Sequence, residues 1–434
     1  MKDTWRRIHI SINLRSLPLK SIALVKLNSI NFNRHFQLFV VIVAAGTIFP
    51  LLYLRQNFEL SILQSFDLTI SQLSNCYALM GLTFALTYLP SGWLADRLNP
   101  RLLILYALVM TGSLGIWFAS IPSYRNLLLI FSCWGISTGL TFWAAHIKIV
   151  SILAGGHYQG RFFGLLDGGR GLVEAMLATI AIWIFSSYLD NVSGASDQAL
   201  KRVIYVYCVA IAIAIGLVYC LLDTSKTGPH SKSSGKLLIE LRLVFLRQDV
   251  WLAAICILCG YQLFWATYSF SAHLQENFSL TAVTVGSITV AKLWMRPLGA
   301  ISTGYIGDWF GREYILGLAM LFATCSICAI ALLPVSTKTG VLVAVVLVAG
   351  LATYAVRGIY WSTLHNCAIP DRSKGLVIGL MSMVGYLPDI YLPLVNAAIL
   401  EAYPGKLGYQ IYFLGIAGCG LVGCISVVFL RRVS

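Results

Sequence analysis

The chain has 434 residues, of which 58% are hydrophobic and 11% are charged, and its mean hydropathy is +0.79. A soluble domain carries about 25% charged residues, so this composition excludes a water-soluble globular protein. The net charge of +14 would suggest nucleic acid as a partner of a soluble protein. Here the basic residues lie between apolar segments, so we expect no nucleic acid and a lipid bilayer as the surroundings.

Twelve segments are apolar and long enough to span a bilayer, which takes about 20 residues. Of the Lys and Arg residues, 20 fall before, between or after these segments on one side, and six fall on the other. Cytoplasmic loops carry the excess of positive charge, so we expect both termini in the cytoplasm. The expected spans are 36–54, 72–94, 102–120, 127–152, 162–189, 203–222, 250–272, 282–304, 314–334, 341–364, 376–400 and 411–430.

A polar stretch at 223–249 contains Gly228-Pro229 and several serines, and it separates six spans from six. It predicts a cytoplasmic connector between an N-terminal six-helix bundle at 36–222 and a C-terminal bundle at 250–434. The basic arm at 1–35 has two interpretations that the sequence leaves open. It can lie on the inner leaflet as an interfacial segment or form a disordered leader.

The chain also contains an internal repeat. Residues 92–101 read GWLADRLNPR, and residues 304–312, which begin 212 positions later, read GYIGDWFGR. At an offset of 215, Gly160 matches Gly375 and Glu174 matches Asp389. Parallel halves related by an axis along the membrane normal are one of the known plans of secondary transporters.

The first copy of the loop, G-x-x-x-D-R-x-x-x-R, closely resembles the helix 2–3 signature of the major facilitator superfamily, and the copy at 304–312 resembles a degenerate form of that signature. The resemblance covers about 36–430 and implies an all-α membrane protein with twelve helices in two six-helix bundles. It also implies that the loop Asp closes an inner gate by meeting a helix of the other bundle, with the first copy more firmly constrained. The expected gate residues are Gly92, Asp96, Arg97, Arg101, Gly304, Asp308 and Arg312.

The sequence differs from two better-known branches of the superfamily, and these differences make the functions of those branches less favoured. The helix 5 segment GLLDGGRG at 164–171 lacks the Gly-Pro motif of proton-coupled drug antiporters. Neither 36–54 nor 250–272 contains the Arg that organophosphate:phosphate antiporters carry on helices 1 and 7. The Gly-Gly-Arg-Gly pattern of helix 5 resembles that of poorly characterised bacterial permeases of the superfamily. An organophosphate-type antiporter and a transporter-like membrane sensor remain the alternatives.

Charged residues inside the expected helices are the candidates for coupling and binding, because a charge at the bilayer centre costs at least ~2.5 kcal/mol. Asp167, Arg170 and Glu174 are spaced to pair on one face of helix 5, either as a neutral structural cluster or with Arg170 free for an anion. Asp389 follows Pro388 at the matching depth of helix 11, and desolvation favours its protonated form. We expect proton coupling at Glu174, Asp389 and Asp167, with a structural link from Asp389 to Lys292 or Arg296 as the rival.

The buried cations favour an anionic solute. Lys292 and Arg296 share a face of helix 8, and Arg357 lies in helix 10, whereas Lys148 is expected to extend toward the inner headgroups. The side chains of Tyr and Trp combine an apolar ring with a polar O–H or N–H group, which suits the binding of sugars and organic acids. The expected substrate-binding residues are Arg170, Lys292, Arg296, Arg357, Trp265 and Tyr268.

The sequence thus predicts a monomeric secondary transporter of the bacterial inner membrane. Its expected cargo is a small polar, anionic organic solute such as a sugar acid or carboxylate, moved by proton symport. No metal, cofactor or enzymatic activity is expected, because no nucleophile–base set or metal-ligand cluster occurs at catalytic spacing.

Overall fold

The structure is a computed structural model that describes residues 19–156, 158–191, 196–223, 244–280, 282–365, 367 and 374–433. The first half of the arm at 1–35 and most of the connector at 223–249 lie outside these residues. Residues 19–35 continue without a break into the first membrane helix, so this part is no separate segment.

The first half of the chain forms one helical bundle. Its elements are α1 (Leu19–Leu52), α2 (Arg55–Ser65), α3 (Ile70–Arg97), α4 (Pro100–Phe118), α5 (Tyr124–Ser137), the π-helix η2 (Thr138–Trp143), α6 (Ala144–Ala154), α7 (Gln159–Asn191) and α8 (Ser196–Leu221).

The second half forms the other bundle. Its elements are α10 (Gln248–Trp265), the 3₁₀ helix η3 (Ala266–Ser269), α11 (Phe270–Phe278), α12 (Ala282–Phe310), α13 (Arg312–Leu332), α14 (Thr339–Tyr360), the 3₁₀ helix η4 (Trp361–His365), α15 (Lys374–Gly385), α16 (Pro388–Ala402) and α17 (Lys406–Val433).

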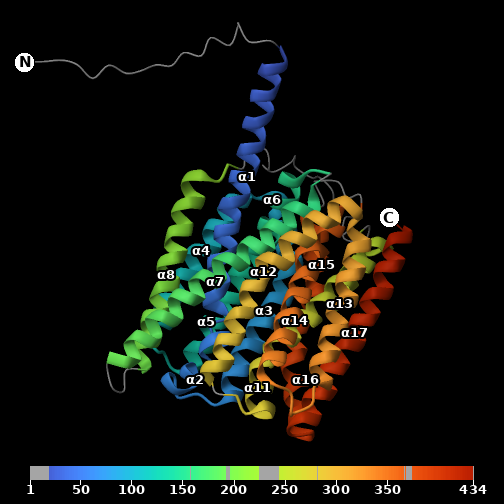
Figure 1. Ribbon diagram of the computed structural model, residues 1–434. Coiled ribbons are helices and arrows are strands. Elements are labelled where there is room, and N and C mark those ends of the chain that lie inside the picture. The colour runs from blue at the N-terminus through green and yellow to red at the C-terminus, as the bar shows by residue number, and fades with distance from the viewer. Residues whose placement is uncertain are drawn as a thin grey trace, which may run out of the picture.

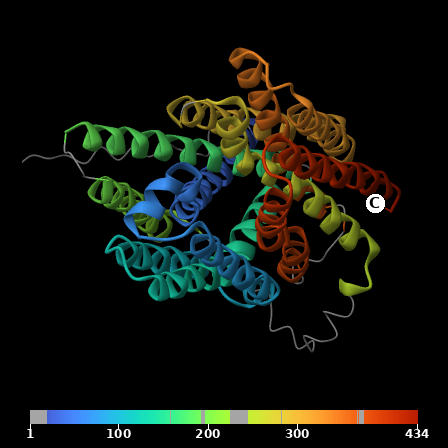
Figure 2. The ribbon, with the colours of Figure 1, turned by 90° about the horizontal axis from the view of Figure 1, so that it is seen from below.

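Eleven helical stretches of the described chain are apolar and long enough to cross a membrane. α12 supplies the twelfth, because its 29 residues extend about 43 Å at 1.5 Å per residue. The predicted twelve-helix fold is confirmed. Seen from below, the blue-to-green helices of the first half and the yellow-to-red helices of the second half lie on opposite sides (Figure 2).

α1 begins and α17 ends on the same side of the molecule, which is the upper side in Figure 1. This side, called the inner side below, is the one that the distribution of Lys and Arg predicts to be cytoplasmic.

The loop between α3 and α4 is built by local capping. Asn99 Oδ1 accepts from the main-chain N–H of Arg101, and Pro100 occupies the first helical position, where no N–H is needed. The equivalent loop between α12 and α13 turns at Gly311, whose φ of 98° an L side chain rarely adopts. Each loop leaves the preceding Asp at the end of its helix.

Glycines let the two bundles meet closely on the inner side. A Cβ at Gly160 would lie 2.6 Å from the carbonyl oxygen of Gly304, and one at Gly92 would overlap the carbonyl of Gly375. The α7–α12 and α3–α15 contacts are therefore backbone-to-backbone approaches that only glycine permits. This packing places the gate loops directly against the helix ends of the other bundle.

Candidate functional site

Two carboxylates join the bundles on the inner side. Asp96, at the end of α3, accepts from the main-chain N–H groups of Gly375 and Leu376, both at 3.1 Å, at the start of α15. Asp308, at the end of α12, accepts from Gly160 at 3.0 Å and Arg161 at 2.9 Å, at the start of α7. The first N–H groups of a helix lack intrahelical partners and attract negative charge. We call these two contacts the Asp96 clasp and the Asp308 clasp.

The cations around the Asp96 clasp differ from the expectation. Lys148 does not extend to the headgroups: its Nζ lies 2.6 Å from Asp96 Oδ1, and it is 3% exposed. Arg97 instead stacks on Trp93, with Cζ 4.3 Å from the ring centroid, and Arg101 donates to the carbonyl oxygen of Tyr219. A loop carboxylate buried against the other bundle gives Lys148 a nearer partner than the lipid surface.

The Asp308 clasp is at least as strongly held, contrary to the expectation from its degenerate motif. Its carboxylate pairs with Arg312 at 3.0 Å and lies 3.6 Å from Arg161 Nε. The Asp308 side chain is 2% exposed, against 11% for Asp96. The motif that is weaker in sequence therefore builds the better-buried clasp, and a second cation, Arg161, comes from α7.

We expect Asp96→Asn and Asp308→Asn to slow uptake by similar factors of about 10 or more. Each change removes a charge that accepts two main-chain hydrogen bonds, and such bonds contribute about 1.5–3 kcal/mol each. Initial uptake rates in proteoliposomes measure the effect. Glu313→Gln, an acid in the first turn of α13 outside both clasps, is the control. A normal rate for the Asp308 variant beside an inactive Asp96 variant would contradict the equivalence.

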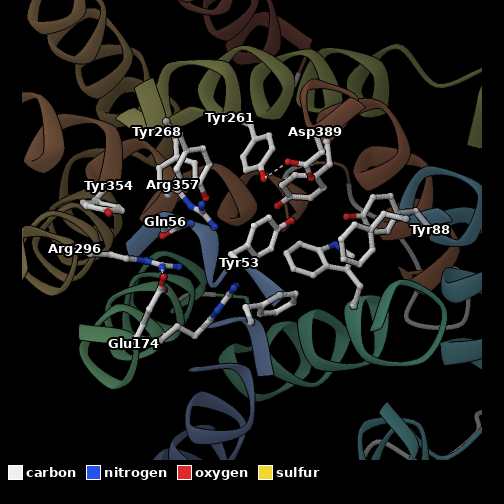
Figure 3. A pocket seen from close by; sticks show the side chains of 16 residues that line it. Tyr53, Gln56, Tyr88, Glu174, Tyr261, Tyr268, Arg296, Tyr354, Arg357 and Asp389 are labelled. Atoms are coloured by element: carbon white, nitrogen blue, oxygen red, sulfur yellow. Dashed lines mark hydrogen bonds and ion pairs between the residues drawn. The ribbon is translucent and has the colours of Figure 1, made fainter. Parts of the chain in front are cut away.

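A central pocket lies between the bundles. It holds about 570 Å³ of empty space, counted with the part open to solvent, and both halves of the chain contribute to it (Figure 3). Its walls are mostly aromatic, with charged groups from α7, α12, α14 and α16. The lining residues are Phe49, Tyr53, Gln56, Phe84, Tyr88, Trp143, Arg170, Glu174, Tyr261, Phe264, Tyr268, Arg296, Tyr354, Arg357, Tyr386 and Asp389.

Arg296 of α12 reaches across the bundle interface to both acids of α7. Its Nη2 and Nε lie 2.8 and 3.2 Å from the oxygens of Asp167, and its Nη1 lies 2.5 Å from Glu174 Oε2. Arg357 Nε adds a longer contact of 3.6 Å to Asp167. Buried charges need such partners. Of the two interpretations that the sequence leaves open, the neutral cluster with Arg170 is not formed, because Arg296 of the other bundle pairs with both acids.

Arg170 is thereby left without an acid. In the described part of the chain no carboxylate oxygen lies within 4 Å of its guanidinium, and its buried Nε has no hydrogen-bond partner. The side chain is 8% exposed. Its Cζ lies 4.9 Å from the ring centroid of Phe49 and 5.8 Å from that of Trp143. Aromatic faces support a cation but leave its N–H donors free for a ligand.

Asp389 lies where helix 11 is broken. α15 ends at Gly385 and α16 begins at Pro388, so the chain bends at the depth of the pocket. Broken helices at this depth often form binding sites in transporters. Asp389 Oδ1 accepts from Tyr261 Oη at 2.7 Å and from Trp265 Nε1 at 2.8 Å.

The rival link from Asp389 to Lys292 or Arg296 is not formed. Lys292 Nζ donates to the carbonyl oxygen of Thr267 at 3.1 Å, and Arg296 is held by the acids of α7. Lys292 does not line the pocket, whereas Tyr268 does, and Trp265 acts through its bond to Asp389. Among the described residues, Asp389 is therefore a buried acid bonded by neutral donors.

The sequence did not single out the contribution of α1 and α3 to the pocket. Phe49 and Tyr53 come from the outer end of the first span, Gln56 comes from α2 just after it, and Phe84 and Tyr88 come from the second span. The polar pair Arg55-Gln56 after an apolar helix is a faint signal, but it is equally typical of a helix end.

Comparison with known proteins agrees with this architecture. A sequence model of the Major Facilitator Superfamily matches residues 35–393. Inner membrane protein YqcE of Escherichia coli (strain K12) is 25% identical over 416 residues, which cover 93% of this chain and 96% of that protein. The D-galactonate transporter of Escherichia coli O6:H1 is 21% identical over 392 residues, covering 85% and 88%.

Among solved structures, the crystal structure of a bacterial homologue of the iron transporter ferroportin in an outward-facing state aligns with a TM-score of 0.69. It covers 91% of this chain and 98% of its own, at 12% sequence identity. This likeness concerns the fold alone.

Proposed function

Because the chain belongs to the major facilitator superfamily, we propose that it carries a small organic anion together with a proton by alternating access. It is a multi-pass inner-membrane transporter and not an enzyme. We propose further that the cargo is anionic, that a proton moves with it and that the protein works as a monomer.

The observation that carries the proposal is the guanidinium of Arg170, which lines the central pocket and makes no ion pair with a described acid. Arg296 is held by two acids and Arg357 lies 3.6 Å from Asp167, whereas Arg170 has no described carboxylate oxygen within 4 Å of its guanidinium. A carboxylate would accept two charge-assisted hydrogen bonds from this guanidinium in a bidentate arrangement. The D-galactonate transporter among the relatives supports an organic anion as the cargo.

The proton is assigned to Asp389. Its side chain is 8% exposed, and its partners Tyr261 and Trp265 are neutral donors that can stay bonded to a protonated or an ionised carboxyl. Asp167 and Glu174 are less suited, because each neutralises Arg296, and protonating either would leave that guanidinium with less charge compensation. The coupling role expected for three acids is thus reduced to one.

The Asp96 and Asp308 clasps explain how the inner side of the transporter is kept closed. With both formed, the bundles are held together on the inner side, and the pocket is separated from that side by the α7–α12 and α3–α15 contacts. We propose that release of the cargo requires both Asp96 and Asp308 to leave the helix N-termini. Their bundles then rock about the central site.

The purified protein in proteoliposomes tests the proposal directly. With labelled D-galactonate as the probe, we expect accumulation when the interior is alkaline and only equilibration after a proton ionophore is added. A one-unit gradient corresponds to about 1.4 kcal/mol, enough for about tenfold accumulation with one proton per anion. Uptake that is unchanged by the ionophore would overturn proton coupling.

A further inference from the structure

Four tyrosines in the central pocket have hydroxyl groups without a partner. Tyr53, Tyr88, Tyr268 and Tyr354 line the pocket, and no hydrogen bond joins their hydroxyls to any described residue. The neighbouring Tyr261 and Tyr386 are different, since Tyr261 donates to Asp389 and Tyr386 bonds with Tyr360 and Trp361. The pocket therefore contains two kinds of tyrosine. The hydroxyls of one kind bond to other residues of the protein, and those of the other kind do not.

Burial makes these free hydroxyls informative. Tyr88 is 4% exposed and Tyr354 is 2% exposed, yet both carry a polar group that faces the pocket without a protein partner. These hydroxyl oxygens are not among the fully enclosed polar atoms of the described residues, so they open onto the pocket, where a ligand can reach them. A ligand with several hydroxyls would satisfy them.

The four hydroxyls come from both bundles. Tyr53 and Tyr88 belong to the first half of the chain, and Tyr268 and Tyr354 belong to the second. Figure 3 shows Tyr53 projecting toward the middle of the pocket, Tyr354 beside Arg296, and Tyr88 on the side of Asp389. Gln56 adds an amide to the same wall. Donors and acceptors thus surround a central space.

The charges of the pocket limit the cargo to one anionic group. The three guanidiniums of Arg170, Arg296 and Arg357 lie near only two acids, Asp167 and Glu174, so this part of the described pocket has a surplus of one positive charge. A second negative charge on the cargo would exceed this surplus of one positive charge. Phe49 and Phe264 offer flat apolar faces for carbon-bound hydrogens.

Resting on the proposed anion transport, we propose that the cargo is a polyhydroxylated monocarboxylate, that is, a sugar acid. Its carboxylate binds Arg170, and its hydroxyls bind Tyr53, Tyr88, Tyr268 and Tyr354. A simple carboxylate would leave the tyrosines unsatisfied, and a neutral sugar would leave the Arg170 cation unsatisfied. A sugar phosphate would bring a second charge that the pocket does not balance.

Three probes of similar size separate these classes. D-gluconate carries the carboxylate and the hydroxyls, hexanoate carries only the carboxylate, and D-glucose carries only hydroxyls. We expect the purified protein to bind D-gluconate at least tenfold more tightly than either other probe, as measured by calorimetry. Equal affinity for hexanoate and D-gluconate would overturn the assignment of the tyrosines.

Tyr268→Phe and Tyr354→Phe test the contacts one at a time. Each removes one hydroxyl, and we expect about 3- to 10-fold weaker binding of D-gluconate with unchanged binding of hexanoate. Tyr391→Phe, on α16 outside the pocket lining, is the control and should bind both acids normally. Equal losses for both acids would show a structural role of the tyrosines, which overturns the proposal.

The outcomes also separate this inference from the proposed function. If hexanoate is accumulated with protons and D-gluconate is not, anion transport stands and the sugar-acid assignment falls. If neither acid binds, both proposals fail together. Tyr to Phe is the smallest change available at these positions, and the thermal unfolding of each ligand-free variant verifies that it is folded.

Discussion

Asp389→Asn is expected to abolish accumulation against a gradient while leaving exchange of solute across the membrane intact. Asparagine is neutral at every pH, so the variant should behave like a permanently protonated protein. Its amide oxygen can still accept from Tyr261 and Trp265, which preserves the local geometry. The accumulation ratio should fall from about 10 per pH unit to 1. Net uptake and counterflow in the same proteoliposomes measure the two modes.

Asp249→Asn is the matched control. Asp249 is an acid in the first turn of α10 that pairs with Arg247 at 2.5 Å, away from the central pocket. This variant should accumulate normally. Loss of counterflow together with accumulation in the Asp389 variant would instead indicate a structural role. Retained accumulation would move the proton to another group, with Glu174 as the next to test.

The features that the sequence predicts well are those with local causes. Membrane spans follow from the length of apolar segments, and the two clasps are expected from the family resemblance that the repeated loop carries. The donors that meet Asp96 and Asp308 are main-chain N–H groups at helix starts, which any sequence provides. That these loops meet the other bundle is implied by the resemblance to the superfamily, and the contact itself needs no particular side chain on the other bundle.

The pairing of the buried charges could not be predicted in the same way. Spacing along one helix identifies neighbours three or four positions apart, and this favoured Arg170 as the partner of Asp167 and Glu174. The actual partner, Arg296, lies 129 positions from Asp167, on a helix of the other bundle. Which helix faces meet one another depends on tertiary packing, and a single sequence does not contain that information.

The π-helix η2 explains a further part of the site. It covers Thr138–Trp143, within a span that sequence periodicity treats as one regular helix. A π-helix widens the turn, so the residues after it occupy a different face from the one that a period of 3.6 predicts. Trp143 consequently lines the pocket beneath Arg170, and His146 and Lys148 are buried.

Arg170→Gln is expected to weaken binding of a carboxylate by at least about 100-fold, because it removes two charge-assisted hydrogen bonds of about 1.5–3 kcal/mol each. Arg170→Lys should lose less, about tenfold, since a lysine keeps the charge but loses the planar fork. Calorimetry with D-gluconate measures the affinities. Arg202→Gln is the control, because Arg202 lies on α8 and contacts Tyr188.

The stability of the ligand-free variant separates a binding role of Arg170 from a structural one. If Arg170 mainly neutralised Asp167 and Glu174, its loss would destabilise the protein by about 3–5 kcal/mol, as for other broken buried ion pairs. Those acids are already held by Arg296, so we expect only the loss of the cation–π contacts, about 0.5–2 kcal/mol. A strongly destabilised variant with normal affinity would contradict the assignment.

The position of Arg170 places the bound anion next to a contact between the bundles. Trp143, whose ring lies near the Arg170 guanidinium, donates from Nε1 to Ser382 Oγ at 2.8 Å across the bundles. An anion on Arg170 would therefore bind beside a side-chain hydrogen bond that joins the two bundles.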